Sequence, residues 1–229
     1  MPVPSTTPPT ISSILPNSSA VSRRTVLVGA AALAALPARA AEGIGEVVFV
    51  HQWANRIDGA GNSTGLYVDD AVRFQETVAT VARGALHLNM LDGSEVRLGS
   101  DCRVVLDEFV YDPGKPEAGT MVATVGKGIA RFVSGNIKQR FQVRTPTVTI
   151  GIRGTDFSVW VEDDRDGRTT IWVNEGAIVV QPAAGGAAVE VPQDSTVAVE
   201  AGSTDVDLNA PRPPSDPGLS PRLRLGPNR

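Results

Sequence analysis

Cysteine is almost absent from the chain: Cys102 is the only one in 229 residues, so no intramolecular disulfide can form. A lone cysteine of this kind is expected to be a buried small hydrophobic side chain. Histidine is equally scarce, with His51 and His87 only, and no Gly-x-Ser-x-Gly element occurs. Because a Ser-His-Asp hydrolase needs a nucleophile on a sharp turn beside a base, the sequence does not predict an enzyme.

Several binding motifs are missing as well. The sequence has no zinc-ligand spacing, no glycine-rich phosphate loop and no aromatic-basic nucleic-acid module, so we predict no cofactor and no metal. The nearest approach to a metal site is residues 162–167, whose alternating acids imitate the start of a calcium loop. The acid required at the twelfth position falls on Val173, which favours a solvated turn and leaves weak calcium binding as the alternative.

Acidic residues are absent from residues 1–40, and this segment has the features of an export signal. A twin-arginine-type motif is followed by an apolar run at residues 26–36, which is too short to span a bilayer comfortably. Small residues then precede a predicted cleavage point, which indicates a periplasmic or secreted Gram-negative protein without a stable transmembrane anchor. The residues that carry this interpretation are Arg23, Arg24, Ala38 and Ala40.

Cleavage after residue 40 would also change the charge of the protein. The whole chain has 21 basic and 25 acidic residues; removing three arginines leaves 18 basic residues, so the net charge becomes −7. A surface with this excess of acid disfavours polyanionic partners, and we expect no nucleic acid to bind.

Apolar residues between the two ends recur at every second position, which is the period of a strand and not of a helix. Only residues 69–83 offer room for a helix, and their β-branched composition favours strand there too. Frequent turn signals between the runs indicate an all-β fold, namely a sandwich, a barrel or a β-solenoid. The alternating runs lie at 86–90, 96–98, 104–106, 141–143, 148–152, 157–161, 171–173, 178–180, 189–191 and 197–199.

The two ends of the chain are expected to be disordered. Residues 1–21 are rich in proline, serine and threonine, and residues 201–229 contain six prolines. We therefore predict a signal segment at 1–40, a main β domain at 43–182, its last strands at 183–200 and a disordered proline-rich tail at 201–229.

Residues 143–157 (VRTPTVTIGIRGTDF) resemble the signature stretch of the FecR domain family. Further family-like segments agree in order, at 45–47, 91–96, 106–109, 131–135 and 173–176, so the resemblance covers residues 43–182. It implies an all-β fold, in the form of a twisted solenoid-like stack of short strands, and a non-catalytic role in the bacterial envelope. Members of this family relay the signal of a TonB-dependent receptor to a sigma factor, and other members are standalone envelope proteins.

The signature residues are first interpreted as structural. Pro146 favours extended geometry before it, which suits a strand corner, and the glycines allow close backbone approach. Arg153 has five donors that could clamp carbonyls exposed at the bend, and its alternative role is to face a partner or bind a carboxylate. The motif comprises Thr145, Pro146, Gly151, Arg153, Gly154 and Thr155.

The three tryptophans are candidate partner contacts. If Val161 lies opposite Ile171 in a hairpin, Trp160 lies opposite Trp172 on the other face, either as core or as an interface anchor. Trp53 lies in a turn-rich stretch, where ordinary packing competes with contact to a sugar or peptide.

Together these features predict a non-catalytic exported protein that binds an envelope protein or surface component. One alternative is a soluble accessory regulator in a TonB-receptor and sigma-factor system. The other is a carbohydrate-binding protein or an unrecognised hydrolase.

We predict that N-terminal sequencing of the exported protein starts at Ala41, because signal peptidases cut after small residues such as Ala40. A mature protein that still begins at Met1 would contradict the export interpretation.

Overall fold

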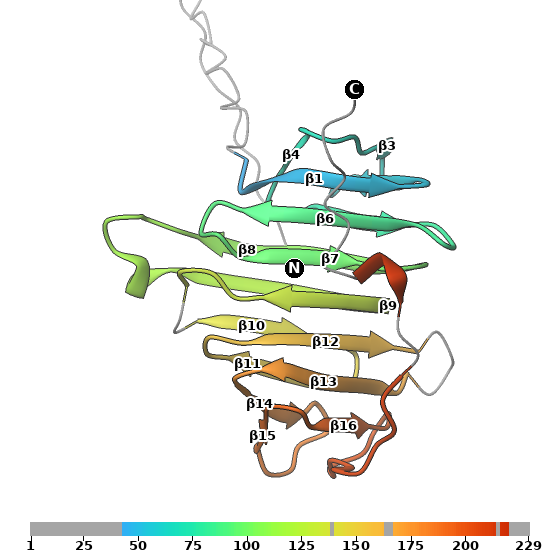
Figure 1. The fold of residues 1–229 in the computed structure, drawn as a ribbon, viewed down its shortest axis with the longest axis vertical. Coiled ribbons are helices and arrows are strands. Elements are labelled where there is room, and N and C mark those ends of the chain that lie inside the picture. Colours follow the sequence, from blue (N-terminus) through green and yellow to red (C-terminus); the bar gives the residue numbers. More distant parts are fainter. Residues whose placement is uncertain (1–42, 138–139, 163–166, 214–215, 220–229) are drawn as a thin grey trace, which may run out of the picture. The chain divides into compact units, whose positions relative to one another are not determined.

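The computed structural model describes residues 43–137, 140–162, 167–213 and 216–219, and within them it is all-β, as predicted (Figure 1). No α-helix occurs among these residues, and the stretch 69–83 forms two strands. The strands are β1 (Gly45–His51), β2 (Ala54–Ile57), β3 (Ser63–Gly65), β4 (Ala71–Val72), β5 (Thr77–Thr80), β6 (Ala85–Met90), β7 (Glu95–Leu98), β8 (Arg103–Val110), β9 (Thr120–Val133), β10 (Phe141–Arg144), β11 (Val148–Ile152), β12 (Asp156–Val161), β13 (Thr169–Glu175), β14 (Ala177–Pro182), β15 (Val189–Pro192) and β16 (Thr196–Val199), with 3-10 turns η1 (Pro116–Ala118) and η2 (Pro217–Leu219).

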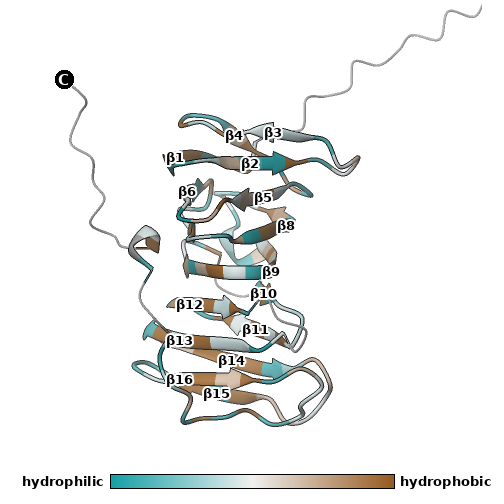
Figure 2. Cartoon of the chain, turned by 90° about the vertical axis from the view of Figure 1, so that its right-hand side faces the viewer, coloured by the Kyte–Doolittle hydropathy of each residue, from teal (hydrophilic) through white to brown (hydrophobic). Residues whose placement is uncertain are grey.

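The strands form two ladders that share one strand. Ladder A runs β4-β1-β6-β7-β9-β12-β13-β16, and ladder B runs β3-β2-β5-β8-β9-β10-β11-β14-β15. Figure 2 shows the ladders side by side, with hydrophobic positions along the strands of both. All pairings are antiparallel except the one between β9 and β10.

The core lies between the two ladders because each strand turns alternate side chains inward. Phe132 of ladder A meets Phe141 of ladder B with ring centroids 6.3 Å apart, and it stacks on Phe157 at 5.6 Å. All three rings are fully buried or nearly so, and Cys102 is buried beside them in the same cluster, as expected. The period-two pattern of the sequence therefore arises because alternate residues of each strand point into one shared core.

β9 crosses from one ladder to the other in mid-strand. Residues 120–127 of this strand pair with β8 and β10, and residues 128–133 pair with β7 and β12. Gly128 lies at the crossing with a φ of 78°, and a Cβ there would lie 2.5 Å from the Cα of Cys102. Only glycine fits both the left-handed conformation and this close approach.

The β12–β13 register differs from the one predicted. Ile171 pairs with Val159, not Val161, so Trp160 lies opposite Thr170 and is diagonal to Trp172. A shared apolar face fixes only whether a register is odd or even, so a two-residue shift keeps the same side chains inward. The actual shift is set by the connection from 162 to 168, which closes with a bond from the Glu162 amide to the Arg168 carbonyl.

The proline-rich tail is not disordered throughout, in contrast to the prediction. Residues 201–213 and 216–219 are described, and Asp207 exchanges two backbone hydrogen bonds with Ala198 of β16. Ala210 and Leu219 are buried, and Leu219 packs against Ile129 and Trp172 of ladder A. Composition alone missed these contacts because prolines prevent regular structure without preventing docking on a sheet.

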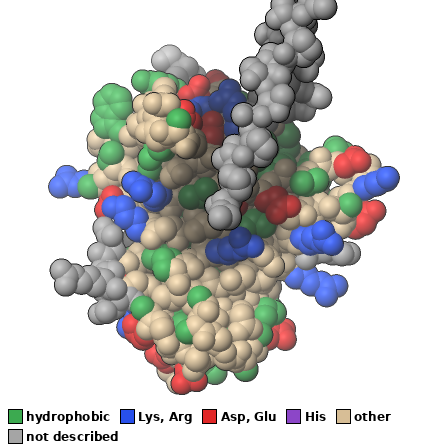
Figure 3. All heavy atoms as spheres, turned by 180° about the vertical axis from the view of Figure 1, so that it is seen from behind, with side chains coloured by type: hydrophobic (Ala, Val, Ile, Leu, Met, Phe, Trp, Pro, Cys, Tyr) green, Lys and Arg blue, Asp and Glu red, His purple; other side chains and the backbone are tan. Residues whose placement is uncertain are grey.

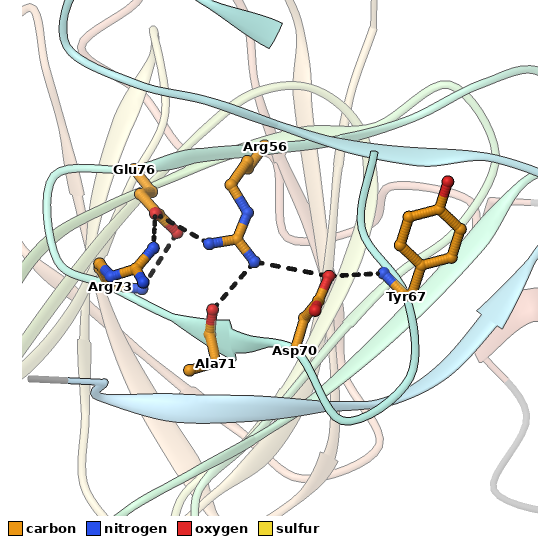
Figure 4. Close-up of polar contacts among 6 residues, drawn as sticks. All are labelled: Arg56, Tyr67, Asp70, Ala71, Arg73 and Glu76. Atoms are coloured by element: carbon orange, nitrogen blue, oxygen red, sulfur yellow. Dashed lines mark hydrogen bonds and ion pairs between the residues drawn. The ribbon is translucent and has the colours of Figure 1, made fainter. Parts of the chain in front are cut away.

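A polar network connects β2 of ladder B with β4 of ladder A (Figure 4). Arg56 of β2 donates to Glu76 at 3.3 Å and to the Ala71 carbonyl at 3.0 Å, and lies 3.7 Å from Asp70. Glu76, only 7% exposed, also accepts from the Arg73 amide and guanidinium. Since this buried acid bonds to two arginines of its own chain, the network is structural and leaves no group directed at a ligand.

Gly128→Ala is expected to lower the free energy of unfolding by about 2–4 kcal/mol, because it combines backbone strain with a clash against the backbone of residue 102. The matched control is Gly59→Ala, whose added Cβ meets no atom within 4 Å. Urea denaturation compares the two, and a Gly128→Ala loss as small as that of the control would contradict the crossing.

Candidate functional site

Four turns of the family-like segments lie side by side at one end of ladder A. They connect β6 to β7, β9 to β10, β11 to β12 and β13 to β14. In the first, the fully buried Asp92 accepts hydrogen bonds from the Ser94 amide and hydroxyl. The Gly135 amide donates to Ser94 Oγ at 2.8 Å, and a Cβ on Gly135 would lie 2.3 Å from the Ser94 nitrogen. The first two turns are therefore interlocked.

The next two turns continue the row. Thr155 donates its amide to Ser134 Oγ at 2.8 Å and accepts from the Ser134 amide at 2.9 Å. Gly154 has a φ of 68°, and a Cβ on Gly176 would lie 2.7 Å from its carbonyl oxygen. Gly154 and Thr155 are thus fixed by packing between turns, which agrees with a structural role.

Asp156 reinforces the same row from the strand side. Its carboxylate accepts two hydrogen bonds from Arg131 of β9 and one from the Asn174 side chain of β13 at 3.2 Å. The hydrogen bonds from Arg131 to this carboxylate raise the pKa of the guanidinium. Three neighbouring strands are therefore tied together by one acid.

Thr145 and Pro146 form the corner between β10 and β11. Thr145 Oγ1 accepts from the amides of Thr147 and Val148 at 3.2 and 3.1 Å and lies 2.9 Å from Thr169 Oγ1. Pro146 is exposed at the turn, where its missing donor costs nothing. The corner is therefore closed by the chain itself.

Gly151 and Arg153 differ from the rest of the motif because they face outward. Gln142, Gly151, Val179 and Glu190 are paired in one row across β10, β11, β14 and β15. This row lines a groove of about 680 Å³ on the outer face of ladder B, with Arg153 at its border. Figure 3 views the molecule from behind, where basic side chains are spread over the middle and acidic ones lie at several places, including the lower end.

Arg153 does not act as the expected internal clamp. It is exposed, and it makes no hydrogen bond or ion pair within the part of the chain that the structure describes. The Thr155 carbonyl at the bend accepts from the Ser134 amide and not from this guanidinium. The observed position favours the alternative of a partner-facing, carboxylate-binding arginine.

Gly151 leaves the middle of the groove open. A Cβ there would approach no atom closer than 3.9 Å, and no positive φ requires glycine. The fold therefore tolerates a side chain at this position. Glycine here leaves the groove deeper and does not relieve backbone strain. Val179 contributes an apolar surface there and is 45% exposed. The sequence carried this signal, since an apolar residue occupies an outward position between the buried Ile178 and Val180.

The three tryptophans differ in solvent exposure. Trp53 is 64% exposed, so the packing expected for it is absent. Trp172 is 7% exposed and packs with Ile129 and Leu219, while Trp160 lies against the same cluster. The pair is thus covered by the chain's own C-terminal segment.

The two histidines do not form a hydrolytic relay. His51, Ser100 and Asp216 line one hollow of about 490 Å³. Ser100 Oγ, however, accepts from the Arg83 amide at 2.7 Å, and Asp216 accepts from the Ser100 and Gly218 amides. Among the described residues no hydrogen bond joins His51 to either group, so the hydroxyl has no base beside it.

Other predicted features lie outside what the structure describes. The signal residues belong to 1–42, and residues 163–166 of the acidic turn are not described either, so weak calcium binding there stays a prediction. In the described ranges no group of three or more histidine, cysteine, aspartate or glutamate side chains is placed to hold a metal. The same ranges contain no helix of the length and apolarity needed to cross a membrane.

His87 lies on the outer face of ladder A and is 9% exposed. Its Nε2 hydrogen-bonds the Gly218 carbonyl at 2.6 Å, and its ring packs 4.8 Å from that of Phe49. Burial lowers the pKa of the imidazole, an effect that the Arg97 cation increases and that the Gly218 bond and Glu95 oppose.

We predict that the stability contributed by His87 is complete above its unfolded pKa of about 6.5 and is lost as the pH falls below it, since the unfolded chain then binds more protons. Between pH 7.5 and pH 5.5, the urea midpoint of unfolding should decrease more in the wild type than in His87→Gln. Equal falls in the two proteins would contradict this.

Comparison with known proteins finds a matching family model and similar solved structures. A family model described as FecR protein matches residues 76–179, a narrower range than the 43–182 expected from the sequence. Two solved structures from Parabacteroides distasonis, described as a candidate anti-sigma factor, are 16% identical, with TM-scores of 0.46 and 0.45. The match covers 57% of this chain and 57% of each of those chains. No curated protein matches.

The matched range contains all four turns at the end of ladder A, the Thr145–Pro146 corner and the outward-facing Gly151 and Arg153. The resemblance inferred from the sequence is confirmed over residues 76–179, which match the FecR family model.

Proposed function

We propose that this protein is a non-catalytic, exported binding module that contacts an envelope protein through the groove of ladder B. The observation that carries the proposal is the exposed, unpaired Arg153 beside the side-chain-free Gly151. The remaining residues of the motif are engaged by the chain itself, so these two have no structural task that the described contacts reveal. The FecR match supports a signalling-related role, and the predicted signal segment supports a periplasmic location.

The chemistry of the groove suits a protein segment. Its floor is apolar around Ile178 and Val179, while Arg153 and Glu190 supply opposite charges at its border. A loop that presents a small apolar side chain next to an acid would bury the former and pair the latter with the guanidinium. The groove is open to solvent and formed by four short strands, which fits a docking surface better than an enclosed small-molecule site.

Trp53 supports a second candidate function, the binding of a sugar. An indole exposed to 64% on the β1–β2 connection offers a flat apolar face of the kind that stacks on sugar rings. This site is separate from the groove lining, and saturable glycan binding lost in Trp53→Ala would support it.

We expect a photo-crosslinking amino acid at Val179 to capture an envelope protein in living cells, and Arg153→Ala to reduce that crosslink at least tenfold by removing the cation. Gly151→Val should have the same effect by filling the groove, with an unchanged melting temperature. Crosslink yields on denaturing gels measure both.

The matched control is Arg103→Ala, which removes an exposed arginine from the same ladder outside the groove lining. A crosslink that survives Arg153→Ala and Gly151→Val, or that falls equally in Arg103→Ala, would contradict the proposal.

A further inference from the structure

The outer face of ladder A carries a bound segment of the chain itself. A row of outward side chains crosses this face in register, from Phe49 through His87, Arg97, Arg131 and Ser158 to Trp172. Residues 216–219 contact the middle of the row, and Figure 2 shows η2 on the outer side of the ladder. This face is therefore not an ordinary solvated surface.

Asp216 is held in a site shaped for a carboxylate. Its Oδ2 accepts from the Ser100 amide at 2.8 Å, and its Oδ1 accepts from the Gly218 amide at 2.7 Å. A Cβ on Gly99 would lie 2.4 Å from the Oδ2 atom. The glycine at position 99 is thus what lets the carboxylate approach the sheet.

Gly218 and Leu219 are recognised separately. The Gly218 carbonyl accepts from His87, and a Cβ at this residue would lie 2.8 Å from that of Ala85, so a side chain here would collide with the sheet. Leu219 is only 5% exposed and packs into the cluster of Ile129 and Trp172. The face therefore selects an acid, a glycine two positions later and an apolar residue directly after it.

Arg212 adds a third point of attachment. Its guanidinium lies 5.5 Å from the centre of the Trp172 ring, and it donates to the Asn174 side chain at 3.2 Å. Trp172 is consequently contacted on two sides by the segment, by a cation and by Leu219.

The occupied site is incompletely filled. The hollow of about 490 Å³ continues from Asp216 and Gly218 along Phe49, Gly84 and Ala85. A ligand with a larger apolar group beside the acid would bury more surface than the chain's own segment does. The site therefore has room for a better occupant than the one that it holds.

We propose that the outer face of ladder A is a peptide-binding site for an extended segment with an acid, a glycine and an apolar residue in the spacing Asp-x-Gly-Leu. Arg212 and residues 216–219 occupy it in cis, and a partner protein with a segment of the same chemistry displaces them. Displacement exposes Trp160 and Trp172, the aromatic anchors that protein interfaces favour. This site is distinct from the groove of ladder B and does not rest on the function proposed there.

The test uses the full exported chain and a fluorescent synthetic peptide with the sequence of residues 210–219. In the wild type the peptide competes with a tethered copy of itself, whose effective concentration is in the millimolar range, so binding should be weak. The double variant Asp216→Ala, Leu219→Ala weakens the cis contact, and peptide affinity by fluorescence anisotropy should rise at least tenfold. A peptide with alanine at the two corresponding positions should not bind.

A second readout is acrylamide quenching of tryptophan in a Trp53→Phe background. Quenching should increase at least twofold in the double variant and stay unchanged in Leu208→Ala, which removes an exposed tail side chain. Equal peptide affinity in wild type and double variant, or equal quenching, would overturn the proposal. A double variant that unfolds would overturn it as well, because the segment would then be a structural element and not a displaceable one.

Discussion

The rest of the structure depends on one shared strand. β9 supplies the central pairing of both ladders, so neither ladder is complete without it, and the two cannot separate while it is intact. The constraint is local: Gly128 lets the strand cross at a point where any side chain would strike the backbone of Cys102. With the ladders joined in this way, Phe132 and Phe141 meet across one core, and the period-two pattern of the whole chain follows.

Because the two ladders pack on each other, the molecule has two outer faces, one covered by the chain itself and one open to solvent. The face of ladder A is covered by the C-terminal segment, whose Asp216, Gly218 and Leu219 are each held by specific groups. The face of ladder B remains open where Gly151 leaves a hollow beside Arg153. Within the FecR-like signature, the residues that close turns and the residues that face outward are thus separated in space, although they lie close together in sequence. The binding role proposed for this protein rests on the second group.

Much of the fold could be predicted from the sequence, because each short strand alternates clearly between apolar and polar residues. The longest strand could not be predicted, because Gly126 and Gly128 interrupt the pattern of β9 and its two halves pair in different ladders. The register of β12 on β13 was missed by two residues, since alternation fixes parity but not the length of the turn. Arg153 and the tail were misjudged for a related reason. Whether a polar group is already satisfied, or a proline-rich segment finds a surface, depends on contacts between residues far apart in sequence.

Amide hydrogen exchange across β9 tests the central claim most directly, since exchange reports the free energy at which each segment opens. If one strand unites both ladders, Thr124 on one side of Gly128 and Phe132 on the other exchange only through global unfolding, with the same free energy. Clearly different opening energies on the two sides, with one ladder exchanging while the other stays protected, would contradict the account.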